Sequence, residues 1–190
     1  MQKKSRWLLA LSGLLFWTSL MAAPLPGDSI YQLDLSLTDM AGKQVKLADF
    51  AGQPLTVSMF YGNCSSACPV LLKKLQASAK KLPTNAYRHL SILLVSLDPA
   101  NDTADSLNML IDDDKLDPKV FRLAVARNEA DTRQLASVLG IKYRRLDNGT
   151  INHSTRIVLL DAQGRVLYHD DRIGVGADAA LIEAWHTQLK

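Results

Sequence analysis

The chain has 190 residues, of which 22 are Lys or Arg and 19 are Asp or Glu. Three of the cations and none of the anions lie in residues 1–23, so residues 24–190 carry 19 charges of each sign. A neutral domain lacks the excess of positive charge that is typical of nucleic-acid-binding proteins, so we expect no nucleic-acid partner. This length is enough for one domain with its own hydrophobic core.

The first 23 residues have the pattern of a secretory signal peptide. Basic residues come first, residues 7–21 form an apolar run, and Ala22 and Ala23 close it. The run is shorter than the ~20 apolar residues that cross a bilayer, but Leu20 or Met21 fits the cleavage site poorly. We therefore assign residues 1–23 to a signal peptide or an uncleaved N-terminal membrane anchor, and residues 24–190 to one domain. The protein is expected to be periplasmic, or anchored to the periplasmic face of the inner membrane through this segment alone.

The elements of the domain can be taken in chain order. The first half predicts strands at 29–38 and 44–47 joined as a hairpin, a helical turn at 47–52, a buried strand at 54–61, a helix to about residue 81, and a buried strand at 89–98. The second half predicts a helix at 103–113, a strand at 121–125, a helix ending at Gly140, an extended segment at 143–146, strands at 156–160 and 165–169, and a helix at 178–189.

Both cysteines of the chain lie between the first buried strand and the helix that follows it. Helix N-termini favour negative charge, so the thiolate form of Cys64 or Cys68 is favoured there. A disulfide between them would close a very small loop and would stabilise the fold little. Redox or metal chemistry is therefore the better interpretation. A redox-active pair after the first long buried strand predicts a thioredoxin-like α/β fold, here a central mixed sheet flanked by helices with an N-terminal β-hairpin extension.

The two thiols could also bind a soft metal ion. Thiolates select Cu(I) or Zn(II) over hard cations, and a third ligand would complete the site. His153 is the candidate, because in thioredoxin-like folds the residue before the strand at 156–160 faces the cysteine turn. The remaining histidines are expected on the surface: His89, His169 and His186.

Three motifs together resemble the Sco/SenC family of copper chaperones. They are Cys64-x-x-x-Cys68-Pro69 after an aromatic-rich strand, Ser96-Leu97-Asp98-Pro99 followed by Asp102-Thr103, and the distant His153. The resemblance implies a thioredoxin-like fold and one copper ion, Cu(I) or Cu(II), held by the two cysteines and the histidine. It further implies a metallochaperone rather than an enzyme in turnover, with a possible thiol–disulfide reductase activity.

The resemblance also implies partners and supporting residues. The expected partner is the copper-bearing subunit of a respiratory cytochrome c oxidase, whose cysteines the protein would load with copper or reduce, or another copper chaperone. Asp98 and Asp102 are interpreted as residues that support the ligands or contact a partner; the alternative for Asp102 is capping of the next helix.

The chain departs from the family pattern in two residues and one segment length. Many members have proline directly after the first cysteine and aspartate before the histidine, where this chain has Ser65 and Asn152. The segment 140–153 is also short. An exported thiol–disulfide oxidoreductase remains the alternative function. A peroxidase of the peroxiredoxin type fits poorly, because the nearest proline upstream of Cys64 is Pro54.

Overall fold

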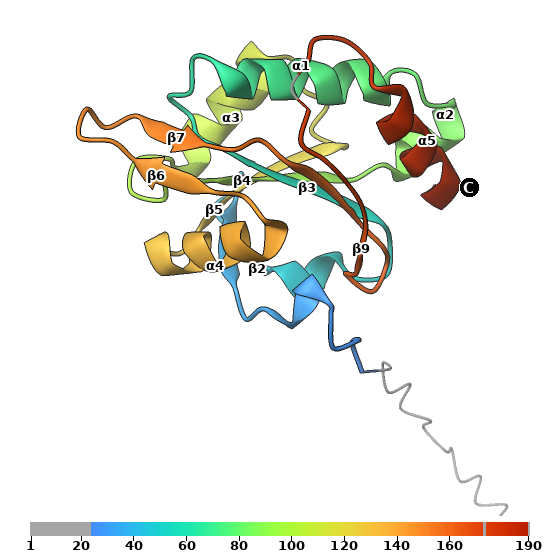
Figure 1. Cartoon of the computed structure of the whole chain (residues 1–190), viewed down its shortest axis with the longest axis horizontal. Helices are drawn as coiled ribbons and strands as arrows, with labels where there is room; N and C mark the ends of the chain where they lie inside the picture. Colours follow the sequence, from blue (N-terminus) through green and yellow to red (C-terminus); the bar gives the residue numbers. More distant parts are fainter. Residues whose placement is uncertain (1–23, 173, 190) are drawn as a thin grey trace, which may run out of the picture.

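The computed structural model describes residues 24–172 and 174–189, which form a seven-stranded mixed sheet with helices on both faces (Figure 1). The strand order is β2-β1-β5-β4-β3-β8-β9. Strands β3, β4 and β5 run parallel to one another, and their neighbours pair antiparallel. Strands β6 and β7 form a second, two-stranded antiparallel sheet. The predicted thioredoxin-like fold, with its central mixed sheet and N-terminal hairpin, is confirmed.

The strands are β1 (Ser36–Asp39), β2 (Gln44–Lys46), β3 (Leu55–Phe60), β4 (Ile92–Ser96), β5 (Phe121–Ala126), β6 (Tyr143–Arg145), β7 (Ile151–His153), β8 (Ile157–Leu160) and β9 (Val166–Asp170). The helices are the 3-10 turns η1 (Ile30–Gln32) and η2 (Leu47–Phe50), with α1 (Ala67–Ala79), α2 (Thr84–His89), α3 (Ala104–Asp113), α4 (Glu129–Leu139) and α5 (Ala179–Gln188). In Figure 1, α1 and α5 lie on one side of the large sheet and α4 on the other, while the β6–β7 hairpin extends from one end of the molecule.

The centre of the sheet is apolar along the whole length of its strands. Every residue of β3 and of β4 is buried, which is typical of parallel strands covered on both faces. The last helix is fastened to this centre by Trp185, whose fully buried indole N–H donates to the Thr56 hydroxyl oxygen at 2.7 Å. Strand β3, which leads to the cysteines, is therefore buried along its length and bonded to the last helix.

The predicted strand at 29–38 is wrong in its first half. Ile30 and Tyr31 are neighbours in sequence and both are buried, an arrangement that the alternation of a half-buried strand does not allow. The 3-10 turn η1 directs both side chains inward, and Ser29 caps it by accepting from the Tyr31 N–H at 3.2 Å. Strand β1 begins only at Ser36 and then pairs with β2 as the sequence predicted.

Two elements were not predicted, helix α2 and strand β7. Helix α2 follows Pro83 in a segment expected only to end the preceding helix. Helix α4 ends as predicted at Gly140, whose φ of 70° is the left-handed conformation that glycine adopts without strain. The predicted signal peptide or anchor at residues 1–23 lies outside the described residues. Among the helices of the described part, none has both the length and the apolar character to cross a membrane.

A buried charge cluster ties helix α1 to the C-terminal part of the fold. Lys74 of α1 lies 2.5 Å from Asp170 at the end of β9 and 3.0 Å from Asp178, the N-cap of α5. The Lys74 and Asp170 side chains are 5% and 3% exposed. Burial disfavours the charged form of Lys74, but its two carboxylate partners outweigh this and raise its pKa. The helix that bears Cys68 is thus fixed by an ion-pair network as well as by apolar packing.

Candidate metal centre

The two cysteines are brought together by the loop between β3 and α1. Cys64 lies in the loop, before the helix begins, and Cys68 is the second residue of α1. The Cys68 N–H donates to the Cys64 sulfur at 3.3 Å. Ser66, at the N-cap, makes no side-chain cap, so the sulfur satisfies a helix N–H that a serine or aspartate oxygen usually accepts. Both cysteines are free thiols, and the expected positions at the strand-to-helix turn are found.

The two thiols differ in acidity. Burial alone would raise the pKa of Cys64, but hydrogen bonds from Cys68 and from the Ser66 N–H lower it to about 7. Burial raises the pKa of Cys68, and the neighbouring Cys64 sulfur raises it further. The sequence favoured a thiolate at either cysteine; the structure assigns it to Cys64, while Cys68 stays protonated at neutral pH.

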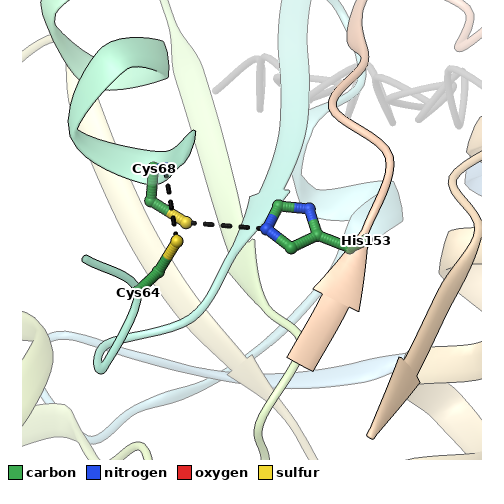
Figure 2. A group of neighbouring side chains, drawn as sticks. All are labelled: Cys64, Cys68 and His153. Atoms are coloured by element: carbon green, nitrogen blue, oxygen red, sulfur yellow. Dashed lines mark hydrogen bonds between the residues drawn. The ribbon is translucent and has the colours of Figure 1, made fainter. Parts of the chain in front are cut away.

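His153 reaches the same point from another part of the chain. It is the last residue of β7, and its Nε2 lies 3.8 Å from the Cys68 sulfur (Figure 2). One donor atom from each of Cys64, Cys68 and His153 can be chosen so that all lie within 4.8 Å of one another. The sequence placed His153 in a loop before a strand, whereas it ends a short strand of its own. The three predicted ligands are nevertheless brought together.

The imidazole is oriented with a lone pair toward the sulfurs. Its Nδ1 lies 3.1 Å from the Ser154 carbonyl oxygen, which can only accept a hydrogen bond, so Nδ1 carries the proton and Nε2 of the neutral ring does not. Tyr61 packs edge-on against the ring, with centroids 5.9 Å apart and planes at 82°. The ring is therefore held in the tautomer and direction that a metal ligand requires.

Asp98 and Asp102 hold the backbone around the site. The Asp98 carboxylate pairs with Arg145 of β6, at 2.6 Å and 3.3 Å, and accepts two bonds from the Asn101 amide. Burial would raise the pKa of Asp98, but the Arg145 guanidinium and the Asn101 amide keep it below its usual range. Asp102 accepts from the Gly62 N–H at 3.0 Å and from the Ser96 hydroxyl.

The alternative role for Asp102, capping of α3, is wrong. The N-cap is Thr103, whose hydroxyl accepts from the Ser106 N–H at 3.2 Å, and the Thr103 N–H in turn donates to the Ser106 hydroxyl oxygen at 2.9 Å. The Asp102 carboxylate instead points toward Gly62, where only a glycine leaves room for it: a Cβ on that residue would lie 2.5 Å from the carboxylate. The loop that contains Cys64 therefore contacts this carboxylate through the backbone N–H of Gly62.

The donor set suits a soft monovalent metal. Two sulfurs and one imidazole nitrogen match Cu(I), and Zn(II) is the common competitor for such ligands. The three donors come from three different segments of the chain: the loop, the helix and the hairpin. The same two thiols can instead form a disulfide, which would remove both sulfurs from the metal. The arrangement therefore permits metal binding or thiol redox chemistry, in alternation.

Sequence reasoning missed two residues of the site. Tyr61 was noted only as the end of a buried strand, and Arg145 only as part of an extended segment. The partner of Arg145 lies 47 residues away, so no local pattern indicates the pair. The other three histidines, as expected, have exposed side chains: His89, His169 and His186.

Comparison with known proteins identifies the family of this chain. A family model described as SCO1/SenC matches residues 25–181, most of the chain. The chain belongs to the SCO1/SenC family. No curated protein matches its sequence. The expected Sco/SenC membership is confirmed.

Solved structures share the fold of this family member at low sequence identity. A putative electron transfer protein from Aquifex aeolicus is 20% identical with a TM-score of 0.73, and covers 86% of this chain and 94% of its own. A SCO1/SenC family lipoprotein from Bacillus anthracis is 19% identical with a TM-score of 0.73, covering 83% and 95%. ScoI from Bradyrhizobium japonicum, solved with copper bound, is 19% identical with a TM-score of 0.65, covering 82% and 94%. Family and site together support a copper-binding or redox role.

Proposed function

We propose that this protein binds one copper ion through Cys64, Cys68 and His153 and serves the copper centre of a respiratory cytochrome c oxidase. The convergence of two thiols and an imidazole lone pair, although His153 follows the cysteines by 89 and 85 residues, carries this proposal. Bound copper in the Bradyrhizobium japonicum relative supports the choice of metal. Three soft or borderline donors favour Cu(I), and an added ligand from water or a partner would suit Cu(II).

Access to the site fits a protein that hands its metal on. An open groove of about 460 Å³ runs along the β6–β7 hairpin and includes His153 itself; it is lined by Lys142, Tyr143, Arg144, Asn152, His153 and Ser154. A partner thiolate approaching there can take the metal by ligand exchange, with no change in its oxidation state. The proposed partner is the copper-bearing oxidase subunit or another copper chaperone.

Titration of the reduced protein with Cu(I) against a chromophoric chelator tests the proposal. Wild type is expected to take up one equivalent, and His153→Ala to bind more than ~100-fold more weakly because it lacks one ligand. His186→Ala, at an exposed position on α5, is the matched control and should bind like wild type. Absence of copper uptake by wild type, or equal affinity of His153→Ala and wild type, refutes the proposal.

The unequal thiols favour a second candidate, an exported thiol–disulfide reductase. The Cys64 thiolate would attack a partner disulfide, forming a mixed disulfide and releasing one partner thiol. Cys68 would then lose its proton and attack the Cys64 sulfur, so that the partner leaves as a dithiol and the protein holds the disulfide; two electrons pass to the partner. With Cys68→Ser, the mixed disulfide at Cys64 should accumulate.

The two candidates separate on His153. If copper transfer is the function, His153→Ala loses copper binding and leaves the rate of disulfide reduction nearly unchanged. If wild type binds no copper but reduces a partner disulfide, the reductase is the function. Reconstitution with a copper-free oxidase subunit then tests delivery directly: copper should appear in that subunit only when the loaded protein carries His153.

We also propose that the protein acts outside the cytoplasm, in the periplasm or on the periplasmic face of the inner membrane. The basic start and apolar run of residues 1–23 support this, as does the description of the Bacillus anthracis relative as a lipoprotein. Fractionation of cells that express the full chain, with mass measurement of the product, tests it. Recovery of the intact chain from the cytoplasm would contradict export.

A further inference from the structure

The histidine ligand is carried by an element that has little support of its own. The β6–β7 hairpin has three residues in each strand and pairs with no strand of the seven-stranded sheet in the described part of the chain. An isolated two-stranded hairpin is marginally stable at best in water. The position of His153 over the sulfurs must therefore depend on the contacts between this hairpin and the body of the protein.

The strongest polar contact of that kind is made by Arg145, two residues along β6 from Tyr143, which pairs with His153. Its guanidinium bonds both oxygens of Asp98, at 2.6 Å and 3.3 Å. The Asp98 side chain is 6% exposed and the Arg145 side chain 40%. Asn101 fixes the same carboxylate with two bonds of 2.9 Å. A bidentate pair to a buried, already oriented carboxylate is both strong and directional.

The loop between β4 and α3, which binds Arg145 through Asp98, also binds the loop that contains Cys64. Asp98 and Asp102 both lie between β4 and α3, four residues apart. Asp102 binds the Gly62 N–H of the cysteine loop, and Asp98 binds the hairpin that bears His153. One short segment therefore fixes the sulfur side and the nitrogen side of the site relative to each other.

Two further contacts hold the hairpin at other points. The Tyr143 hydroxyl donates to Glu129 of α4 at 2.9 Å, and Ile151, which faces Arg145 across the hairpin, is buried in the core. These contacts keep the hairpin folded against the body when the ion pair is lost. Removal of Arg145 should therefore loosen the placement of His153 without unfolding the domain.

We propose that Arg145 is a positioning residue for the metal site: its ion pair with Asp98 holds the β6–β7 hairpin so that the His153 imidazole stays within reach of both sulfurs. This inference rests on the proposed copper-binding function and adds a residue to it. Arg145 itself contacts neither the thiols nor the metal. Its effect on copper affinity passes entirely through His153.

Cu(I) affinity in a double-mutant cycle tests this dependence. Arg145→Met should weaken Cu(I) binding by about 10- to 100-fold, the range for residues that orient a metal ligand. In a His153→Ala background the same change should have almost no further effect. Arg145→Lys should restore only part of the affinity, because an ammonium cannot form the bidentate pair. Arg88→Met is the matched control: Arg88 lies on α2, outside the groove that includes His153, and its exposed side chain makes no ion pair with any residue that the structure describes.

A second readout needs no metal. In the reduced, copper-free protein, Arg145→Met should speed hydrogen exchange of the hairpin amides of β6 and β7, while exchange in β3 and β4 stays as in wild type. Arg88→Met should change neither. Faster exchange throughout the domain would mean that Arg145 acts on the whole fold, which overturns the inference.

The outcomes separate this inference from the proposed function. Wild type that binds copper and loses it with His153→Ala, but not with Arg145→Met, keeps the function and refutes the role of Arg145. An equal loss from Arg145→Met with and without His153 also refutes it, because the effect would not pass through the imidazole. Wild type that binds no copper refutes the function, and the inference with it.

Discussion

Replacing Lys74 with methionine should destabilise the domain strongly. The change keeps the length of the side chain and removes the charge that lies 2.5 Å from Asp170 and 3.0 Å from Asp178. Arg172 still binds the other oxygen of Asp170 at 2.8 Å, so one carboxylate oxygen, not the whole group, loses its partner. We therefore take the low end of the cost of breaking a buried ion pair, about 3 kcal/mol of unfolding free energy.

Urea unfolding of the reduced protein at pH 7 measures this loss. With an m-value of ~2 kcal/mol/M, the midpoint should fall by about 1.5 M. Lys46→Met is the matched control: Lys46 bonds Asp34 at 2.9 Å, but the two side chains are 61% and 88% exposed, and solvent screening leaves such pairs little effect on stability. If the two variants shift the midpoint equally, the reasoning about burial is refuted.

The pH dependence has a fixed sign. Although burial opposes it, Arg172 and Lys74 hold the pKa of Asp170 far below its usual range. A carboxylate with a lowered pKa in the folded state contributes stability above its unfolded pKa, about 3.9, and this is lost as the pH falls through the folded pKa. The difference in unfolding free energy between wild type and Lys74→Met should therefore be constant from pH 5 to pH 7 and become smaller below about pH 4.

Three further predictions concern the site and the core. Iodoacetamide should alkylate Cys64 before Cys68, at a rate that rises with pH to half its plateau near pH 7; peptide mass spectrometry that finds Cys68 modified first would contradict the assignment. Gly62→Ala should lower the unfolding free energy by about 1–3 kcal/mol and weaken Cu(I) binding, because the added methyl group displaces the Asp102 side chain. An unfolding free energy and a Cu(I) affinity equal to those of wild type would contradict this. Trp185→Phe should cost about 2 kcal/mol, because it leaves a buried hydroxyl unpaired; a thermal unfolding midpoint equal to that of wild type would refute this.

The sequence predicted most of the elements that position the site. Runs such as 89–98 are apolar enough to indicate a central strand, and the cysteines lie where β3 gives way to α1. His153 could be selected because its place before the last hairpin has a fixed relation to the cysteine turn in this fold. The strand predicted around residue 30 was wrong, because its apolar residues belong to a 3-10 turn and such a turn can also bury adjacent apolar side chains.

The supporting contacts could not be predicted from the sequence. The pairs Arg145–Asp98 and Lys74–Asp170 join residues 47 and 96 positions apart, and nothing in the neighbouring sequence distinguishes these side chains from solvent-exposed charges. The assignment of acidity between Cys64 and Cys68 likewise depends on which sulfur receives the helix N–H. Each is a property of the folded chain as a whole.

The separation of the two sheets has an evolutionary consequence. Because β6 and β7 share no strand pairing with the large sheet among the described residues, their connecting turn can gain or lose residues without shifting the register of any other strand. The length of this turn can thus change while the fold is kept, a fold that this chain shares with solved structures only 16–20% identical to it. Changes at the exposed positions of this turn would then leave the large sheet and its register as they are.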